Sequence, residues 1–246
     1  MVASPAAADA VRRARALPSL RIGLHVVLVE ARPALPPEQV PDLVGTDGSF
    51  RTDMARLGFD IAMKPAVRRQ MAAEITAQFE AYRATGLSLD HVNAHKHFHL
   101  HPMIAARMIA IGEKFGARAI RVPIEPLSIV RAIDPTISAL MPGLLGQWAR
   151  VLRAQARRAG MAAPDAVFGL AWSGAMTRAR LTALLENLPA GVVEIYTHPA
   201  TAGAFAGHAP GYRYAEEFLA LTDPGCIAAL RRADHRPGGF SDIFNA

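Results

Sequence analysis

The chain has 246 residues, of which 51% are hydrophobic and 20% are charged. So apolar a chain of this length can bury a sizeable core, which excludes intrinsic disorder. Its single cysteine excludes an intramolecular disulfide framework. No apolar run approaches about 18 residues, and the opening MVASPAAADAV lacks the basic start of a signal peptide. We therefore expect a cytoplasmic protein without a membrane-spanning helix.

Basic residues outnumber acidic ones by 27 to 21, which gives a formal net charge of +6. Such an excess can indicate a nucleic-acid or anionic-membrane partner. Here it is mostly arginine spread over helical patterns, and aromatic residues make up only 7% of the chain. Neither a zinc-finger spacing nor an arginine-aromatic-glycine pattern occurs, so we expect no nucleic-acid partner.

Apolar runs typical of buried strands alternate with helical patterns along the chain. Residues 1–3 are compatible with only a short strand, and the following pattern is helical. The expected helices are 5–16, 65–85, 102–115, 144–159, 178–187 and 215–221. The expected strands are 22–29, 89–93, 117–122, 166–171 and 192–196. This alternation predicts an α/β fold with a parallel sheet or barrel, built as one domain of residues 1–246.

Residues 30–60 form a long segment that contains four prolines and a TDGSF turn. We expect it to cross one mouth of the barrel. The helix expected at 144–159 carries arginines on one side and apolar residues opposite. The arginines are Arg150, Arg153 and Arg157, and the apolar residues are Leu144, Leu145, Trp148 and Leu152. Such a helix fits either an anionic membrane surface or an ordinary outer face of the barrel.

Five histidines lie within eleven residues of the segment LDHVNAHKHFHLHP: His91, His95, His97, His99 and His101. All five have odd numbers, so on an extended strand they point to one face, and Asp90 points to the other. A proline that opens the next helix places them at the carboxyl end of a strand, where α/β barrels carry their chemistry. Neutral imidazole is a common zinc ligand, so the spacing predicts a metal site. The alternative is a solvated histidine-rich loop.

Three further residues are candidates because each lies in or at the end of an expected strand. His25 lies within IGLHVVLV, where a buried imidazole must be ligated or hydrogen-bonded, for example to a backbone carbonyl. His198 follows VVEIYT and is either a general acid or base or a turn residue beside Pro199. Arg121, in AIRVP, either holds an anionic group or forms a surface ion pair.

The segments GLHVVL, AHKHFHLHP, AIRVP, EIYTHPA and YRYAEEFLAL occur in the order and spacing of the YdjC/ChbG-like carbohydrate deacetylases. The chain resembles this family over nearly its whole length. GLHVVLVEARPALPP and PDLVGTDGSF are most similar to the branch associated with hopanoid biosynthesis. The resemblance implies a distorted (β/α) barrel of the YdjC type that holds one divalent metal ion, Mg or Zn. It also implies a hydrolase that removes an N-acetyl group from an N-acetylglucosamine-type sugar on a hopanoid glycolipid.

The resemblance implies that His25 and His95 bind the metal together with an aspartate from the first strand. The metal would polarise the acetamide carbonyl and activate a water molecule. A histidine that matches His198 would protonate the departing amine. The substrate pocket would be lined by His97, His99 and Arg121.

Family members begin with a strand that ends in Asp-Asp-Phe-Gly, and this chain lacks that motif. The motif supplies the metal carboxylate and the general base. We therefore expect the first strand to be missing or incomplete, either because the natural protein starts upstream of Met1 or because it is truncated. A protein that starts at Met1 is expected to bind metal weakly and to deacetylate poorly.

Two other functions stay open at this stage. One is a metallo-hydrolase of another barrel family that uses HxH on a strand, although no aspartate accompanies His198 at the late strand end. The other is a non-catalytic or impaired metal- or membrane-binding fragment. The expected partners are an N-acetylated sugar or glycolipid; a homodimer and a peripheral contact with the inner membrane are also considered.

Overall fold

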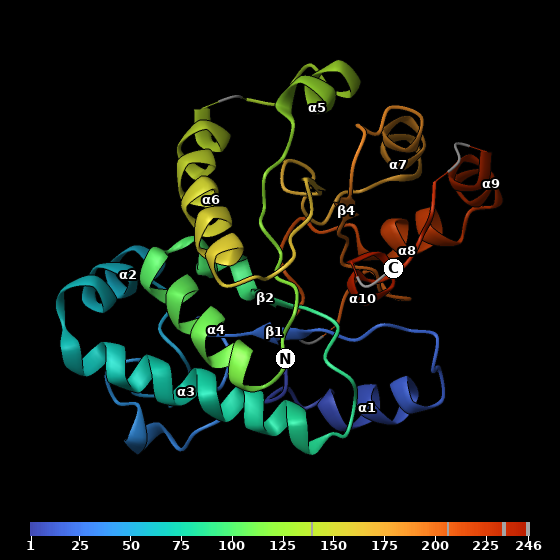
Figure 1. The fold of residues 1–246 in the computed structure, drawn as a ribbon. Helices are drawn as coiled ribbons and strands as arrows, with labels where there is room; N and C mark the ends of the chain where they lie inside the picture. The colour runs from blue at the N-terminus through green and yellow to red at the C-terminus, as the bar shows by residue number, and fades with distance from the viewer. Residues whose placement is uncertain (139, 206, 233–234, 245–246) are drawn as a thin grey trace. The chain divides into compact units, whose positions relative to one another are not determined.

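The computed structural model describes residues 1–138, 140–205, 207–232 and 235–244 (Figure 1). The fold is mixed α/β, and the chain divides into two compact units. The first unit comprises Met1–Arg121, Trp148–Ala163 and Gly238–Ala246, and the second comprises Val122–Gln147 and Pro164–Pro237. The expectation of one domain stays a prediction.

The first unit contains a short parallel sheet surrounded by helices (Figure 1). Its elements are α1 (Ala7–Arg15), β1 (Leu24–Val26), η1 (Pro37–Gln39), α2 (Met54–Met63), α3 (Pro65–Ala84), β2 (Val92–Ala94), η2 (His95–Leu100), α4 (Pro102–Lys114) and α10 (Phe240–Phe244). It also includes α6 (Leu140–Arg158) from Trp148 onward. In the sheet, His25 of β1 lies opposite Asn93 of β2. Isolated parallel bridges extend this arrangement to Ile120 and Ala162.

The helix α3 supplies much of the core of the first unit. Pro65 lies in its first turn, where the missing N–H costs nothing and the fixed φ angle favours a helix. Apolar residues then recur every three or four positions, which gives the helix one buried face. Its buried apolar side chains are Val67, Met71, Ile75, Phe79 and Tyr82. Through its contacts the helix packs against α4 and β1.

Two polar side chains of α3 hold the start of the long 30–60 segment. Gln78 donates from Nε2 to the carbonyl of Val27 at 2.6 Å and accepts from the N–H of Val27 at 2.9 Å. Glu74, which is fully buried, accepts from the N–H groups of Ala34 and Leu35 at 2.8 and 3.0 Å. These bonds satisfy backbone groups that leave the sheet after β1, so they fix where the segment begins.

The second unit has its own parallel pair of strands and its own core. Its elements are α5 (Leu127–Ile133), β3 (Ala166–Phe168), α7 (Arg178–Leu185), β4 (Val193–Ile195), α8 (Tyr214–Thr222) and α9 (Pro224–Arg232). Figure 1 labels β4, α5, α7, α8 and α9 of this unit. Phe168 and Trp172 are buried in the core with side chains of α7. The carboxylate of Glu125 accepts from three successive N–H groups after β3, which shapes the turn there.

All six expected helices form, with ends shifted by a few residues, and four of the five expected strands form as three-residue strands. Residues 117–122 contribute only isolated bridges, and residues 1–3 form no strand. The helices α2, α5, α9 and α10 were not expected. The distorted barrel is not confirmed, because the described residues form two separate two-stranded sheets and no closed one.

The helix α6 agrees only in part with the expected amphipathic pattern. Leu152 is buried and Arg157 is exposed, whereas Trp148 is 46% exposed. The side chains of Leu144 and Leu145 lie outside the described residues. Among the described helices, none combines the length and the apolar character needed to cross a membrane.

Candidate functional site

His25 and His95 lie side by side in the first unit. His25 is on β1, and His95 comes directly after β2, the parallel neighbour of β1. Their ring centroids are 5.7 Å apart and the ring planes make an angle of 75°. A cation about 2.1 Å from one nitrogen of each ring would separate the centroids by roughly 5–6 Å at a tetrahedral angle. The two rings are therefore close enough to bind one ion.

The ring of His25 is oriented by Asn93. Its Nδ1 is 2.6 Å from the Oδ1 of Asn93. An amide oxygen only accepts, so Nδ1 carries the hydrogen and Nε2 keeps its lone pair. Burial lowers the pKa of His25 to about 3, with smaller contributions from the neighbouring charges of His95 and Arg121. The ring is consequently neutral at physiological pH, which is the form that binds metals.

His95 has an acidic neighbour that sequence reasoning missed. Its Nε2 is 3.5 Å from Oε2 of Glu30, and the ammonium of Lys96 donates to the other carboxylate oxygen. Burial lowers the pKa of His95, and Glu30 partly offsets this effect. The sequence did contain a signal for Glu30, because this acidic residue directly follows the apolar run IGLHVVLV that contains His25. A carboxylate at the end of that strand lies at the same edge as His95.

The backbone around these residues adopts unusual conformations. Glu30, Lys96 and His97 have φ angles of 66°, 51° and 53°, and they are the non-glycine residues with positive φ in the described chain. A left-handed conformation of a non-glycine residue costs of order 1–3 kcal/mol, and such residues concentrate at functional sites. Lys96 and His97 directly follow His95 in the sequence, and Glu30 contacts its ring.

The donor set tests whether a metal fits here. Both imidazoles are neutral nitrogen donors, which zinc and similar divalent ions accept. Within the described residues, no group of three or more histidine, cysteine, aspartate or glutamate side chains is arranged to hold a metal ion. The site therefore fits one divalent ion through two nitrogen ligands, and the described residues provide no third protein ligand in this arrangement.

The prediction that the five clustered histidines share one face is wrong. The strand β2 ends at Ala94, and His95–Leu100 forms a 3₁₀ segment that is kinked at Lys96 and His97. Alternation of side chains between two faces requires an extended backbone, so it ends with the strand. The histidines consequently diverge.

Each of the other four clustered histidines has different surroundings. His91 stacks on Phe240, and His101 stacks beside Trp148. His97 is partly buried, with its ring centroid 6.2 Å from that of His99. His99 is fully buried, donates from Nε2 to the Arg121 carbonyl at 2.9 Å, and has its pKa lowered to about 4 by burial.

Arg121 is only 9% exposed, which does not fit the alternative of a surface ion pair. The roles of His97, His99 and Arg121 in binding substrate stay predictions. Asp90 was expected to point away from the cluster, but its Oδ2 lies 2.9 Å from Nδ1 of His91, a member of the cluster. Its carboxylate also accepts from the N–H groups of Phe240 and Ser241.

His198 lies in the second unit, directly after the β4 region. Its backbone N–H donates to one carboxylate oxygen of Glu217, whose other oxygen accepts from the N–H of Met176 at 2.9 Å. Glu217 is almost fully buried, so this part of the backbone is firmly held. The ring of His198 lies between aromatic neighbours, with centroids 5.6 Å from that of Tyr196 and 5.0 Å from that of Tyr212.

Glu30 is one of the residues that line an open cavity of about 860 Å³. It lies in the first unit and is lined mainly by polar and charged residues of the 30–60 segment, among them Asp42, Arg51, Arg56 and Asp60. Its volume is within the range of roughly 300–1,000 Å³ that is common for ligand sites. A polar lining of this kind suits a hydroxyl-rich ligand better than an apolar one.

Comparison with known proteins places these features in a family. The family model described as "YdjC-like protein" matches residues 1–232. The chain is 27% identical to a carbohydrate deacetylase of Geobacillus stearothermophilus over 235 residues, which is 94% of this chain and 79% of the relative. It is 37% identical to a carbohydrate deacetylase of Vibrio vulnificus (strain CMCP6) over 125 residues, 51% of this chain and 45% of the relative.

A solved structure shares the fold. The crystal structure of an Enterococcus faecalis V583 protein named for cellobiose-phosphate cleavage superposes with a TM-score of 0.72 at 20% identity, and it covers 99% of this chain and 85% of that one. The match of the family model over most of the sequence is the decisive finding. The chain belongs to the YdjC-like protein family.

Proposed function

We propose that the protein is a carbohydrate deacetylase that hydrolyses the N-acetyl group of an amino sugar. The observation that carries this proposal is the pairing of His25 and His95, whose ring centroids are 5.7 Å apart, in a chain of the YdjC-like family. The names of the two relatives support the same activity. The polar cavity beside Glu30 supports a sugar as the ligand.

Hydrolysis of an acetamide needs an electrophilic carbonyl, an attacking water and a proton for the departing amine. In this proposal His25 and His95 hold one divalent metal ion, zinc or magnesium. When bound, the ion would polarise the carbonyl as a Lewis acid and lower the pKa of the attacking water. His198 would donate the proton to the amine, and the aromatic rings around it would keep its imidazole in place.

The finer proposal is that the amino sugar is N-acetylglucosamine carried by a hopanoid lipid, handled in the cytoplasm at the inner membrane. The segments GLHVVLVEARPALPP and PDLVGTDGSF support it. The exposed apolar side chains of Trp148 and Val151 on α6 are compatible with a lipid-bearing substrate. The competing proposal is an impaired metal-binding fragment, which is favoured by the absence of a third protein ligand among the described residues.

The test measures acetate released from N-acetylglucosaminyl substrates by the purified protein, first treated with a chelator and then supplied with zinc or magnesium. We expect a low rate of acetate release that depends on added metal and disappears in His25→Ala. Zinc binding without any acetate release would support the impaired fragment. Equal release by the wild type and by His25→Ala would refute the proposed site.

A further inference from the structure

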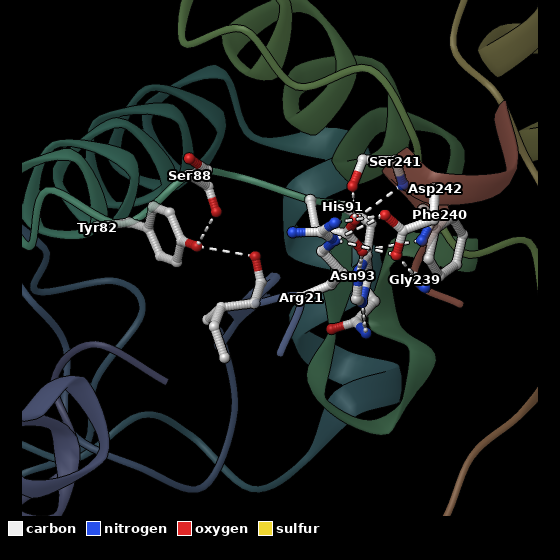
Figure 2. A network of polar contacts seen from close by, with 11 residues as sticks. Arg21, Tyr82, Ser88, His91, Asn93, Gly239, Phe240, Ser241 and Asp242 are labelled. Atoms are coloured by element: carbon white, nitrogen blue, oxygen red, sulfur yellow. Dashed lines mark hydrogen bonds and ion pairs between the residues drawn. The ribbon is translucent and has the colours of Figure 1, made fainter. Parts of the chain in front are cut away.

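A continuous chain of hydrogen bonds leads from His25 to the C-terminal segment of the protein. Figure 2 shows the part of this chain around Asn93, His91 and the segment 239–242. Nδ1 of His25 is 2.6 Å from Oδ1 of Asn93. Nδ2 of Asn93 is 3.4 Å from Nε2 of His91, and Nδ1 of His91 is 2.9 Å from Oδ2 of Asp90. We call Asp90, His91 and Asn93 the positioning chain.

The direction of each hydrogen bond in this chain follows from the groups that can act in only one way. A carboxylate only accepts, so Nδ1 of His91 donates to Asp90. An amide nitrogen only donates, so Nε2 of His91 accepts from Nδ2 of Asn93. This arrangement leaves the amide oxygen of Asn93 to accept from Nδ1–H of His25. Nε2 of His25 is therefore the nitrogen that carries the lone pair.

Asp90 is well suited to fix this direction. Its Oδ1 accepts from the N–H and the hydroxyl of Ser241 at 2.8 and 2.6 Å, and its Oδ2 accepts from the N–H of Phe240 at 3.1 Å. Burial alone would raise the pKa of Asp90, but the hydrogen bonds from Ser241, His91 and Phe240 outweigh burial and lower it. The carboxyl group is thus ionised at neutral pH, although the residue is only 5% exposed.

Two contacts restrict the ring of His91. It stacks on Phe240, with the centroids 4.3 Å apart and the planes tilted by 21°. It also lies close to Gly23, where an added Cβ would come within 2.6 Å of the ring. A glycine at position 23 is what allows this approach. The ring therefore has little freedom to flip and reverse the chain.

We propose that Asp90, His91 and Asn93 are positioning residues that hold His25 with its hydrogen on Nδ1 and present Nε2 to a divalent cation. This inference rests on the proposed metal-binding role of His25. Partners that orient a metal-binding histidine typically contribute 10–100-fold to affinity. The segment 239–242, which lies beside His91 in Figure 2, is in this way connected to the candidate site, although it is distant in sequence from β1.

The first test reads the tautomer of His25 directly, by heteronuclear NMR of the histidine rings in the metal-free protein. In the wild type we expect the hydrogen on Nδ1. In His91→Phe the ring still stacks on Phe240, but Asn93 loses its acceptor, so we expect His25 to populate both tautomers. Asn93→Leu should have the larger effect, because it removes the acceptor for His25 itself.

The second test measures zinc affinity by competition with a coloured chelator. We expect about a tenfold loss in His91→Phe and a loss of 10–100-fold in Asn93→Leu. Ser241→Ala is the matched control, since it removes a hydrogen bond to Oδ1 of Asp90 and leaves Oδ2 facing His91. We expect its affinity to stay within about twofold of the wild type, which separates the positioning chain from anchoring of the C-terminal segment.

If His91→Phe does not fold, Asn93→Asp can be compared with Asn93→Leu instead. It keeps an acceptor for His25, so we expect the wild-type tautomer and no loss of zinc affinity. The proposal is overturned if wild-type His25 carries its hydrogen on Nε2, or if His91→Phe and Asn93→Leu bind zinc as the wild type does. A wild-type protein with the expected tautomer and zinc affinity but no acetate release would refute the proposed function and leave the positioning chain standing.

Discussion

The surroundings of His25 and those of His198 differ in what holds the histidine. His25 is held through its ring, because Asn93 bonds its Nδ1 and the positioning chain fixes the direction of that bond. His198 is held through its backbone, whose N–H donates to Glu217, and its ring packs among aromatic side chains. A ring fixed through one nitrogen presents a defined lone pair, which is what a metal ligand needs.

The backbone hydrogen bond of His198, by contrast, does not depend on the protonation state of its ring. That arrangement suits a group that gains and loses a proton during a reaction. Under the proposed function, two residues of the same type would have different tasks, and the partners that hold each histidine suit its task. The predictions below test this contrast, from the largest expected effect to the smallest.

Removal of either candidate ligand should have the largest effect. For His25→Ala and for His95→Ala we expect acetate release to fall by at least about a thousandfold, with zinc binding lost in parallel. His208→Ala is the control, because this exposed histidine bonds only a nearby carbonyl in the second unit. If both variants kept their activity, His25 and His95 would not be the metal ligands, and the contrast with His198 would fail.

Replacement of His198 should affect turnover but not metal binding. In His198→Gln we expect kcat to fall by about a hundredfold or more, as is typical when a general acid is removed. Zinc affinity, measured in the same preparation, should not change. A variant that loses zinc as well as turnover would show that the two histidines share one task.

Acid should destabilise the first unit through its buried histidines. The pKa of His99 is about 4 in the folded protein and near 6.5 in the unfolded chain. Between these values the unfolded state binds more protons, so stability falls as pH drops from 6.5 towards 4 and levels off below. We expect a loss of about 3 kcal/mol from this residue, measured by urea unfolding across that range. His99→Gln should flatten the profile; an unchanged slope would contradict the assignment.

Glu217→Gln tests how the backbone of His198 is held. The amide keeps one acceptor oxygen, so one of the two N–H groups loses its partner in a buried place. We expect a loss of about 1–3 kcal/mol in the free energy of unfolding. The control is Glu216→Gln, which changes the exposed neighbour on α8. Equal stability of the two variants would mean that Glu217 is not a structural anchor.

Glu30→Gln should have the smallest effect, and it sharpens the comparison at His95. Loss of the negative charge beside Nε2 should weaken zinc binding by about tenfold, because an acidic partner makes a ligating imidazole more basic. Glu38→Gln, an exposed change on η1, is the control. A gain in affinity would indicate that Glu30 competes with the metal for His95.

Sequence patterns predicted six helices well, because the signals of those helices are local, and missed α2, α5, α9 and α10. Pro65 and the buried spacing of α3 lie within one segment, and the helix forms almost as expected. The strand pattern also placed His25 on one strand and His95 directly after another, and the structure pairs these two strands. The alternation argument failed after Ala94, since left-handed conformations at Lys96 and His97 carry no signal in residues other than glycine.

Contacts between distant parts of the chain could not be predicted from one sequence. The partners of Asp90 lie 150 and 151 residues further along the chain, and no local pattern connects them. The same holds for Glu30 and Lys96, which are 66 residues apart. In our proposal the contacts of Asp90 help to fix which nitrogen of His25 carries the hydrogen, and the contact of Glu30 modifies His95. The candidate site was therefore predictable in its residues but not in these contacts.

The amide of Gln78 takes the place of a neighbouring strand for one peptide group, since it bonds both the N–H and the carbonyl of Val27. The chain can therefore leave the sheet at that point without unsatisfied polar groups. As a result, the length of the loop that follows is uncoupled from the geometry of the sheet. Insertions and deletions beyond the Glu74 anchor would remodel the wall of the polar cavity while His25 stays in register, which makes this loop a natural place for substrate preference to diverge.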